Sequence, residues 1–443
     1  MSLYSIAILD SHLITGEFSG GGLMNAQTLL TMFPSRYSVI YFPKSDVYFA
    51  ISENPKLLEN IDKIESVGFT VSKTFKKLWI NDGYSSFRNY RKKLLAGYSS
   101  EIRAVDFVYD NDFYTTLLPF PRINSDILEM CRKSEVAKFG ITLRGYSVIS
   151  NLNNLDLIKL ILRNEISSIL NTETLKRNVS FLIHPLFDRH INRAISRYEN
   201  LKFIAVVNRH LALQNSEMSK DNGKFRFLFP SDISQFKLES GMNPRKNQHD
   251  IFFYSRLVPE KGIFEIPKIL MKIRKLGFDV NLKIAGKFMY KKDEQAFHRL
   301  LDKNGVKEHV NILGFLNEED LKSVLARSKV LIYPSHSDSF SIAILNSIHM
   351  KTKVVAYDLP TLKDLYSDIS AVRFVKEYDT VAMSLAISEI LKEDEGAYFS
   401  SFDNTQTANF LEKTRSSENL LDAISVLIDE AISHYSDETN MGS

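Results

Sequence analysis

The chain has 443 residues, 44% of them hydrophobic and 25% charged, with a formal net charge of +3. These are ordinary values for a globular protein of two or three domains, and a charge so near neutral does not by itself indicate nucleic-acid binding. No apolar run reaches the roughly 18 residues of a membrane-spanning helix. The single cysteine, Cys131, excludes an intrachain disulfide and fits a reducing compartment.

The N-terminal residues show no secretion signal. Ser5–Leu9 is an apolar run followed directly by Asp10, and no basic region precedes it. We therefore expect a cytoplasmic protein, and we leave peripheral contact with the inner face of a membrane open.

The first half of the chain alternates short apolar runs with helical periods, as parallel sheets covered by helices do. Short runs of this kind suit strands that are buried on both faces. The predicted strands are Ser5–Leu9, Tyr37–Phe42, Val105–Tyr109, Phe139–Leu143 and Phe203–Val207, and the predicted helices include Leu23–Met32 and Asp156–Leu170.

A second α/β series begins near residue 225. Its predicted strands are Phe225–Phe229, Asp250–Tyr254, Asn281–Ala285, Val310–Leu313, Val330–Tyr333, Lys353–Ala356 and Ala371–Phe374. Its predicted helices are Ile263–Leu276, Asp293–Asn304, Glu318–Ala326 and Ile342–His349. Two such series predict two doubly wound, Rossmann-like domains, at residues 1–230 and 231–400, with the boundary in the polar stretch 208–247.

The loop Ser255–Gly262 is the clearest candidate for binding an anion. It follows the strand Asp250–Tyr254, and ligands of open α/β sheets bind at the carboxyl ends of strands. Arg256 and Lys261 can converge there on one anion, because arginine offers a bidentate fork and lysine a mobile point charge. Taken alone, a basic pair in a loop favours the alternative of two incidental, solvated cations.

A second loop, Pro334–Ser341, lies between a predicted strand and a predicted helix. Its small residues leave backbone N–H groups free for an anion at the start of the helix. The alternative is ordinary N-capping of that helix by Ser339 or Ser341.

The order and spacing of these pieces resemble one known family. Residues 250–364 are similar to the C-terminal domain of the retaining glycosyltransferases of family four, which have the GT-B fold of two facing Rossmann-like domains. The matching pieces are the Arg256/Lys261 loop, Asn281–Ala285 with Gly286, Leu313–Phe315, Ile332–Ser335, Asp338–Asn346 and Lys353–Asp358.

The resemblance assigns roles to residues of the second half. It implies that Arg256 and Lys261 hold the donor diphosphate and act in catalysis, and that Gly286 belongs to the donor site. It implies that Phe315 lies near the nucleobase, where a stacking role and a core role both remain open. Further implied donor contacts are the amides of Phe340, Ser341 and Ile342.

The family's Glu-x7-Glu motif reads Asp338 and Asn346 in this chain. The resemblance implies that Asp338 is catalytic and contacts the transferred sugar, with its charge kept and its side chain one methylene shorter. It implies a ribose contact for Asn346, where the amide keeps one acceptor oxygen but not the charge. A purely structural role for Asn346 remains open.

In the first half, the resemblance places the glycine loop at Gly21 and Gly22 opposite the donor phosphates. Where many members carry a histidine, this chain has Arg144, a candidate contact for a sugar hydroxyl, a phosphate or an anionic acceptor. Arginine cannot act as a base near neutral pH. Asp110 and Asp112 follow a predicted strand and are candidates for acceptor contacts, although Asp112 also suits a helix cap. Residues from about 400 to 436 are expected to complete the first domain.

The segment Lys73–Tyr98 mixes cationic and aromatic residues. This composition suits an anionic lipid surface, and it would also suit a nucleic acid or a solvated helix face. Because the resemblance is to enzymes that often dock on membranes, we favour the lipid surface and expect no nucleic-acid partner.

The sequence thus predicts a retaining hexosyltransferase that moves a sugar from a UDP-, GDP- or ADP-linked donor to a glycan or lipid-linked acceptor in glycan biosynthesis. No cofactor is expected, and the resemblance implies metal-independent chemistry. Two alternatives remain, a GT-B sugar-nucleotide epimerase and a non-catalytic protein that binds sugar nucleotides.

Overall fold

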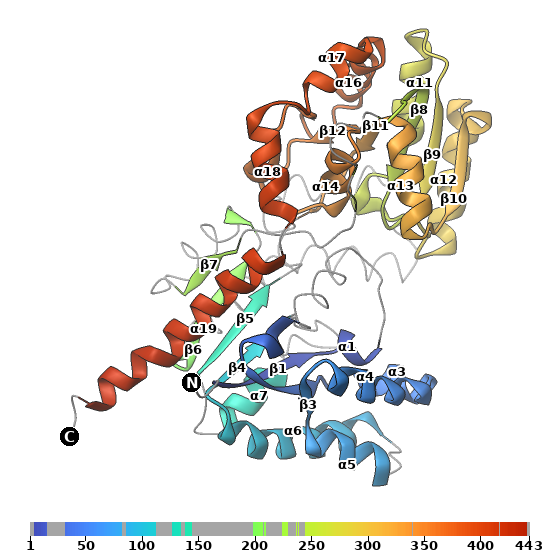
Figure 1. The fold of residues 1–443 in the computed structure, drawn as a ribbon. Helices are drawn as coiled ribbons and strands as arrows, with labels where there is room; N and C mark the ends of the chain where they lie inside the picture. The colour runs from blue at the N-terminus through green and yellow to red at the C-terminus, as the bar shows by residue number, and fades with distance from the viewer. Residues whose placement is uncertain are drawn as a thin grey trace. The chain divides into compact units, whose positions relative to one another are not determined.

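In this computed structural model the chain divides into two compact units, residues 1–233 with 416–443, and residues 234–415 (Figure 1). The structure describes residues 4–15, 32–81, 86–111, 126–133, 138–143, 198–206, 208–209, 224–228, 236, 238, 244–338, 340–415 and 417–440. The predicted helices at 23–32 and 156–170 lie outside these residues, apart from Met32.

The first unit is built on a parallel sheet with the order β3-β2-β1-β4-β5-β6-β7. Its strands are β1 Ser5–Asp10, β2 Ser38–Pro43, β3 Phe69–Val71, β4 Phe107–Asp110, β5 Phe139–Leu143, β6 Leu201–Val206 and β7 Phe225–Phe227. The predicted strand at Phe225 therefore does not open the second series. It pairs with β6, Ile204 beside Phe225, and closes the first sheet.

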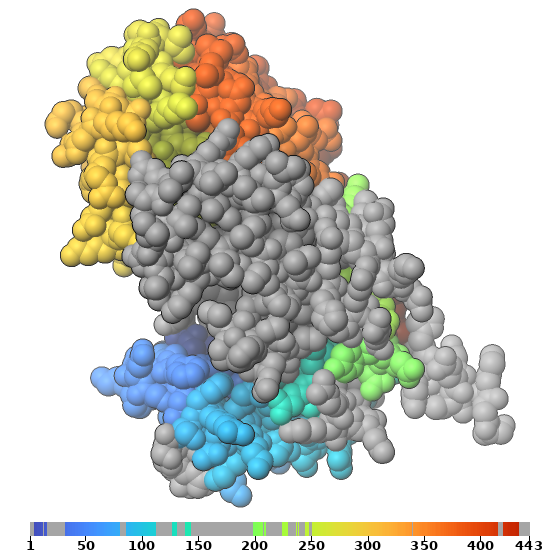
Figure 2. All heavy atoms as spheres, turned by 180° about the vertical axis from the view of Figure 1, so that it is seen from behind, coloured from blue at the N-terminus to red at the C-terminus, as the bar shows by residue number. Residues whose placement is uncertain are grey.

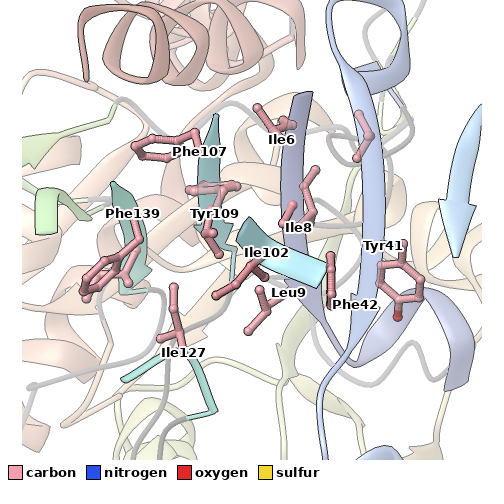
Figure 3. Packing of buried hydrophobic residues seen from close by; sticks show 14 of the residues in the cluster. Ile6, Ile8, Leu9, Tyr41, Phe42, Ile102, Phe107, Tyr109, Ile127 and Phe139 are labelled. Carbon is pink, nitrogen blue, oxygen red and sulfur yellow. The ribbon is translucent and has the colours of Figure 1, made fainter. Parts of the chain in front are cut away.

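The central strands of this sheet are apolar throughout because both of their faces are covered. Residues Ile6, Ala7, Ile8 and Leu9 of β1 are all completely buried. Figure 3 shows buried side chains of the neighbouring strands, among them Phe42, Tyr109 and Phe139, gathered into one core.

Helices of the first unit connect and cover these strands. They are α1 His12–Thr15, α3 Val47–Glu53, α4 Asn60–Ser66, α5 Lys73–Asn81, α6 Phe87–Glu101 and α7 Asp126–Lys133, with the 3-10 helices η1 Phe33–Ser35, η2 Pro55–Glu59 and η3 Ile102–Ala104.

The last helix, α19 (Ser417–Asn440), also belongs to the first unit. Leu420, Leu421, Ile424 and Ile428 lie on one stripe of this helix and enter the first core. The Tyr37 hydroxyl also donates to Asp429 of this helix at 3.0 Å. The chain thus returns to its first unit at residue 416, whereas the sequence analysis places the return near 400.

The second unit contains a parallel sheet with the order β10-β9-β8-β11-β12-β13. Its strands are β8 Asn247–Tyr254, β9 Asn281–Ala285, β10 Val310–Gly314, β11 Ser328–Tyr333, β12 Lys353–Tyr357 and β13 Val372–Val375. From β8 the chain runs outward to β9 and β10 and then returns to β11 on the other side of β8. The switch point between β8 and β11 is where ligands of such sheets bind.

Helices of the second unit are α11 Ile266–Lys275, α12 Lys291–Asn304, α13 Glu318–Arg327, α14 Ile342–His349, α15 Pro360–Tyr366, α16 Thr380–Lys392, α17 Glu395–Ser400 and α18 Thr405–Arg415, with η6 Pro259–Lys261 and η7 Lys307–His309. Figure 2 shows yellow and orange-red segments of this unit packed directly together. In that layer the Ser384 hydroxyl of α16 donates to the Ile269 carbonyl of α11.

Helix α18 stays with the second unit, although it lies after residue 400. The ring of Phe410 packs edge-on against Tyr366 at 5.4 Å, and the Thr414 hydroxyl lies 3.4 Å from His349. These contacts hold α18 on α15 and α14, so the chain leaves this unit only after Arg415.

Candidate anion site at the second switch point

Two glycines bring the loops at the carboxyl ends of β8, β9 and β11 into direct contact. Gly286, after β9, has φ +138°, and a Cβ there would lie 1.9 Å from the Ser255 carbonyl oxygen. Gly262 has φ +74°, and its Cβ would lie 2.0 Å from the Pro334 carbonyl oxygen. Only glycine tolerates such approaches. The loops 255–262 and 334–341 are therefore packed backbone to backbone.

Lys261 is directed across this contact toward the second loop. Its Nζ donates to an Asp338 carboxylate oxygen and to the Ser337 carbonyl, both at 2.7 Å. The exposed fractions of the Lys261 and Asp338 side chains are 12% and 13%, so the ion pair is well shielded from water. The sequence analysis brought these residues to one site but did not predict that they pair with each other.

Both oxygens of the Asp338 carboxylate accept hydrogen bonds. One oxygen accepts from the amides of Phe340 at 3.3 Å and Ser341 at 3.0 Å, and the other accepts from Lys261 and the Tyr333 hydroxyl. Burial raises the pKa of Asp338, but the Lys261 charge and these hydrogen bonds outweigh burial and hold the pKa below its usual value. Asp338 is therefore ionised at neutral pH.

Arg256 is the other cation predicted for this site. Its side chain is exposed, and among the described residues it makes no hydrogen bond or ion pair. Located five residues before Lys261 in the same loop, it offers a complete guanidinium fork to a ligand. The two cations thus differ, because Lys261 is already neutralised by Asp338 and Arg256 is not.

Helix α14 begins beside this cluster. Ser341 is its N-cap, and the Ser341 hydroxyl accepts from the Ile344 amide at 3.2 Å, so the capping alternative holds for Ser341; Ser339 lies outside the described residues. Ile342 is the first residue of α14, and Asn346 lies one turn further along, buried at 4% exposure. A ribose contact by Asn346 remains a prediction.

Ser341 has φ 59° and ψ 87°, which costs a non-glycine residue about 1 kcal/mol or more. We expect Ser341→Gly to stay within about 0.5 kcal/mol of the wild type, because relief of strain offsets the lost cap and the added chain entropy. Ser341→Ala keeps the strain and loses the cap, so its free energy of unfolding should fall by about 1 kcal/mol. Urea unfolding followed by circular dichroism measures the free energies of unfolding of the wild type and the two variants. An alanine variant as stable as the glycine variant contradicts the expected order.

Phe315 follows β10, next to the turn residue Gly314. Its ring is 66% exposed, which rules out the core role, and the Lys287 ammonium lies 5.6 Å from the ring centroid. Gly286 donates its amide hydrogen to the Gly314 carbonyl at 2.7 Å and so joins the β9 and β10 loops. The exposed ring keeps the stacking role open.

A buried histidine that the sequence analysis did not single out lies under the second loop. His336 is 3% exposed, and its ring nitrogens lie 2.7 Å from a Glu377 carboxylate oxygen and 2.9 Å from one of Glu265. Burial lowers the pKa of His336, but hydrogen bonds to the two carboxylates and their charges raise it to about 9. The imidazolium therefore ties α11 and the β13–α16 connection to the loop that carries Asp338.

No local pattern could have revealed this cluster. Glu265 and Glu377 lie 71 and 41 residues from His336 in the sequence. The backbone amide of His336 also donates to the Glu260 carbonyl at 2.9 Å, which fixes the loop to η6.

In the first unit, Asp110 is the predicted acceptor residue that the structure describes. Asp110 ends β4 and forms an ion pair with Lys44 at 2.7 Å, with side-chain exposures of 3% and 6%. Its carboxylate is thus already engaged by a buried cation rather than exposed. Gly21, Gly22, Asp112 and Arg144 lie outside the described residues.

The aromatic residues of segment 73–98 belong mainly to the core of the first unit. Phe75, Tyr90 and Tyr98 are completely buried, and Trp79 and Phe87 pack against the same core. Among the cations, Lys73, Lys77 and Lys92 are exposed, whereas Lys76 pairs with Glu65 and Arg91 with Asp126 and Glu129. The interleaving of aromatic and basic residues is therefore largely the two-sided pattern of the helices α5 and α6.

The helices in the described part of the chain include none that is long and apolar enough to cross a bilayer. The same residues contain no group of three or more His, Cys, Asp or Glu side chains that could hold a metal ion.

Comparison with solved structures identifies the fold. A glycosyltransferase from Rickettsia africae superposes with a TM-score of 0.65 at 13% identity, over 98% of this chain and 99% of that one. The Anabaena protein HepE, solved with UDP and glucose, gives 0.60 at 11% identity, over 96% of this chain and all of that one. The fold is thus the GT-B fold of glycosyltransferases.

Sequence comparison finds relatives of the second unit. Residues 235–400 match the model of the family "Glycosyl transferases group 1". An alpha-D-kanosaminyltransferase of Streptomyces kanamyceticus is 24% identical over 33% of this chain and 37% of that protein. The uncharacterized glycosyltransferase YqgM of Bacillus subtilis is 29% identical over 27% of this chain and 33% of that protein. The matches span about a third of the length of these relatives.

Proposed function

We propose that this protein is a nucleotide-sugar-dependent glycosyltransferase. The observation that carries the proposal is that the loop bearing Arg256 and Lys261 packs against the loop before α14 at the switch point, where Lys261 and the amides of Phe340 and Ser341 converge on one carboxylate. Cations and helix N-termini bind phosphate oxygens. The donor is a UDP-, GDP- or ADP-linked hexose, and the crystal structure of HepE with UDP and glucose supports a donor of this class.

In the proposed reaction the bond between the sugar C1 and the diphosphate oxygen breaks, and a bond from C1 to an acceptor hydroxyl oxygen forms. Negative charge grows on the leaving diphosphate, where Arg256 and Lys261 stabilise it more in the transition state than in the ground state. The acceptor attacks from the side that the diphosphate leaves, which retains the anomeric configuration. The hydroxyl proton passes to the leaving diphosphate, and no metal ion or other cofactor takes part.

A panel of sugar nucleotides, each with and without a glycan or lipid-linked acceptor, tests this proposal. Release of nucleoside diphosphate only when an acceptor is present supports transfer, and the anomeric configuration of the product, read by NMR, tests retention. Conversion of the donor alone would point instead to an epimerase. No binding of any sugar nucleotide by calorimetry would contradict the proposal.

Exposed cations of α5 and α6 support a narrower membrane proposal, in which Lys73, Lys77 and Lys92 are three of the charges that attract an anionic surface. Each such charge contributes about 1 kcal/mol near an anionic membrane, so replacing all three by glutamine should weaken vesicle binding more than tenfold. Flotation with phosphatidylserine vesicles measures this. Replacing Lys56, Lys63 and Lys202, which are exposed elsewhere on the first unit, is the matched control. Equal loss in both triple variants, or no loss in either, contradicts docking through this segment.

A further inference from the structure

The anion position between Lys261 and the start of α14 is filled by a side chain of the protein itself. Four donors converge on the Asp338 carboxylate: the Lys261 ammonium, the Tyr333 hydroxyl, and the amides of Phe340 and Ser341. This is a complete set for a carboxylate, with two donors to each oxygen. It includes the ammonium and two of the amides that the proposed function assigns to the donor diphosphate.

The length of the aspartate side chain makes this arrangement possible. Its Oδ1 turns back to amides two and three residues later, a local turn that Asp and Asn form readily. A glutamate has one more methylene and does not close the same turn. The backbone of Asp338 is fixed separately, because the Thr361 hydroxyl donates to its carbonyl at 2.5 Å. The side chain can therefore leave the amides without moving the loop.

We propose that Asp338 is a resident anion that the donor diphosphate displaces. In this exchange Lys261, Tyr333 and the two amides pass from the carboxylate to phosphate oxygens, and the released carboxylate becomes available to the sugar. Before the exchange, Asp338 cancels the charge of Lys261, so that of the two described cations of the loop 255–262, Arg256 is the one that presents an uncompensated charge to the arriving diphosphate. Competition from Asp338 thus weakens the binding of the donor, and it makes the position of the carboxylate depend on bound phosphate. This inference rests on the proposed function.

The exchange predicts that weakening the resident anion strengthens diphosphate binding. Asp338→Asn keeps an oxygen for the two amides and removes the charge that competes for Lys261. A hydrogen bond to a charged group contributes about 1.5 to 3 kcal/mol, so we expect UDP, GDP or ADP to bind at least about tenfold more tightly. Turnover should fall at the same time, because the carboxylate that reaches the sugar is lost. If the role of Asp338 were only structural, its replacement would not raise the affinity for the diphosphate while it lowers turnover.

Two further variants make the test decisive. Asp338→Glu keeps the charge but loses the turn, so diphosphate binding should also tighten, by a smaller factor. The control is Asp379→Asn, because Asp379 accepts from the amides of Val381 and Ala382 in the same turn, without a lysine partner in the described structure. This control should bind as the wild type does.

Isothermal titration of UDP, GDP and ADP into the full-length protein measures the affinities, and thermal unfolding checks each variant for folding. If Asp338→Asn does not fold, Asp338→Glu gives the answer. Wild-type binding that is as tight as, or tighter than, that of the Asp338 variants overturns the inference and leaves the proposed function standing. If no protein of the set binds any diphosphate, the proposed function itself fails, and the inference fails with it.

Discussion

Replacing either Arg256 or Lys261 with alanine is expected to lower kcat/KM by about two to three orders of magnitude, the usual effect of removing one preorganised group that stabilises transition-state charge. Both residues lie in the loop after β8, and Lys261 reaches across to Asp338 at 2.7 Å. Charge develops on the leaving diphosphate, so a missing cation weakens the transition state more than the bound ground state.

The alanine variants of Arg256 and Lys261 should differ in how much they disturb the rest of the site. Arg256 is exposed, and it binds none of the described residues, so its removal leaves the rest of the loop as it was. Arg256→Lys keeps the charge but loses the bidentate fork, and should recover only part of the activity. Lys261→Ala also leaves the Asp338 carboxylate without its counter-charge, so its effect includes a rearrangement of the second loop.

Matched controls lie before the strands β9 and β10. Arg274, in the last turn of α11, pairs with Asp279, and Lys307 pairs with Asp302. Alanine at either position should leave steady-state turnover unchanged. Near-normal turnover of both Arg256→Ala and Lys261→Ala, measured with a donor found in the panel, would show that this loop does not hold the diphosphate.

Replacing His336 with leucine should lower the free energy of unfolding of the second unit by about 3 to 5 kcal/mol at pH 7, because Glu265 and Glu377 lose the cation between them. The raised pKa of His336 indicates a loss of stability of about the same size. A rise from the ordinary 6.5 to about 9 corresponds to about 3 kcal/mol of stabilisation by the charged ring.

The pH dependence has a definite sign. The folded-state pKa of His336 is raised, so its contribution is complete below about pH 6.5 and is lost as the pH rises toward about 9. The stability difference between wild type and His336→Leu should therefore shrink between pH 6 and pH 9.5. A difference that stays constant over this range would contradict a charged His336.

The molecule contains an internal control for this experiment. Its single tryptophan, Trp79, lies on α5 in the first unit. Trp79 fluorescence should therefore report the first unit, while amide hydrogen exchange of peptides around residues 334–341 reports the loop. For His336→Leu we expect faster amide exchange in that loop than in the wild type, and little change in the fluorescence transition. His298→Leu, which changes a partly buried histidine of α12, is the control for replacing a histidine on another element of the same unit.

The sequence predicted the strands of the second unit closely. Asn281–Ala285 and the helix Ile342–His349 have the predicted bounds, and most other strands differ by one to three residues at an end. These strands are short apolar runs bounded by polar loops, which is a local property. In the first unit β3, only three residues long, was missed because Phe69–Val71 is too short to show a period.

What the sequence determined by itself is the order of the loops: a cationic loop after one strand, a capped helix after another, and glycines where backbones approach closely. That order sufficed to predict the fold and to bring Arg256, Lys261 and Asp338 to one edge. The tertiary structure alone decided which groups meet there. Strand β7 joins the first sheet, His336 lies between two distant glutamates, and Asp338 turns back onto Lys261 and the amides of α14. The reason is physical, since sheet order and side-chain pairing depend on crossovers between segments far apart in the chain, and no local pattern encodes them.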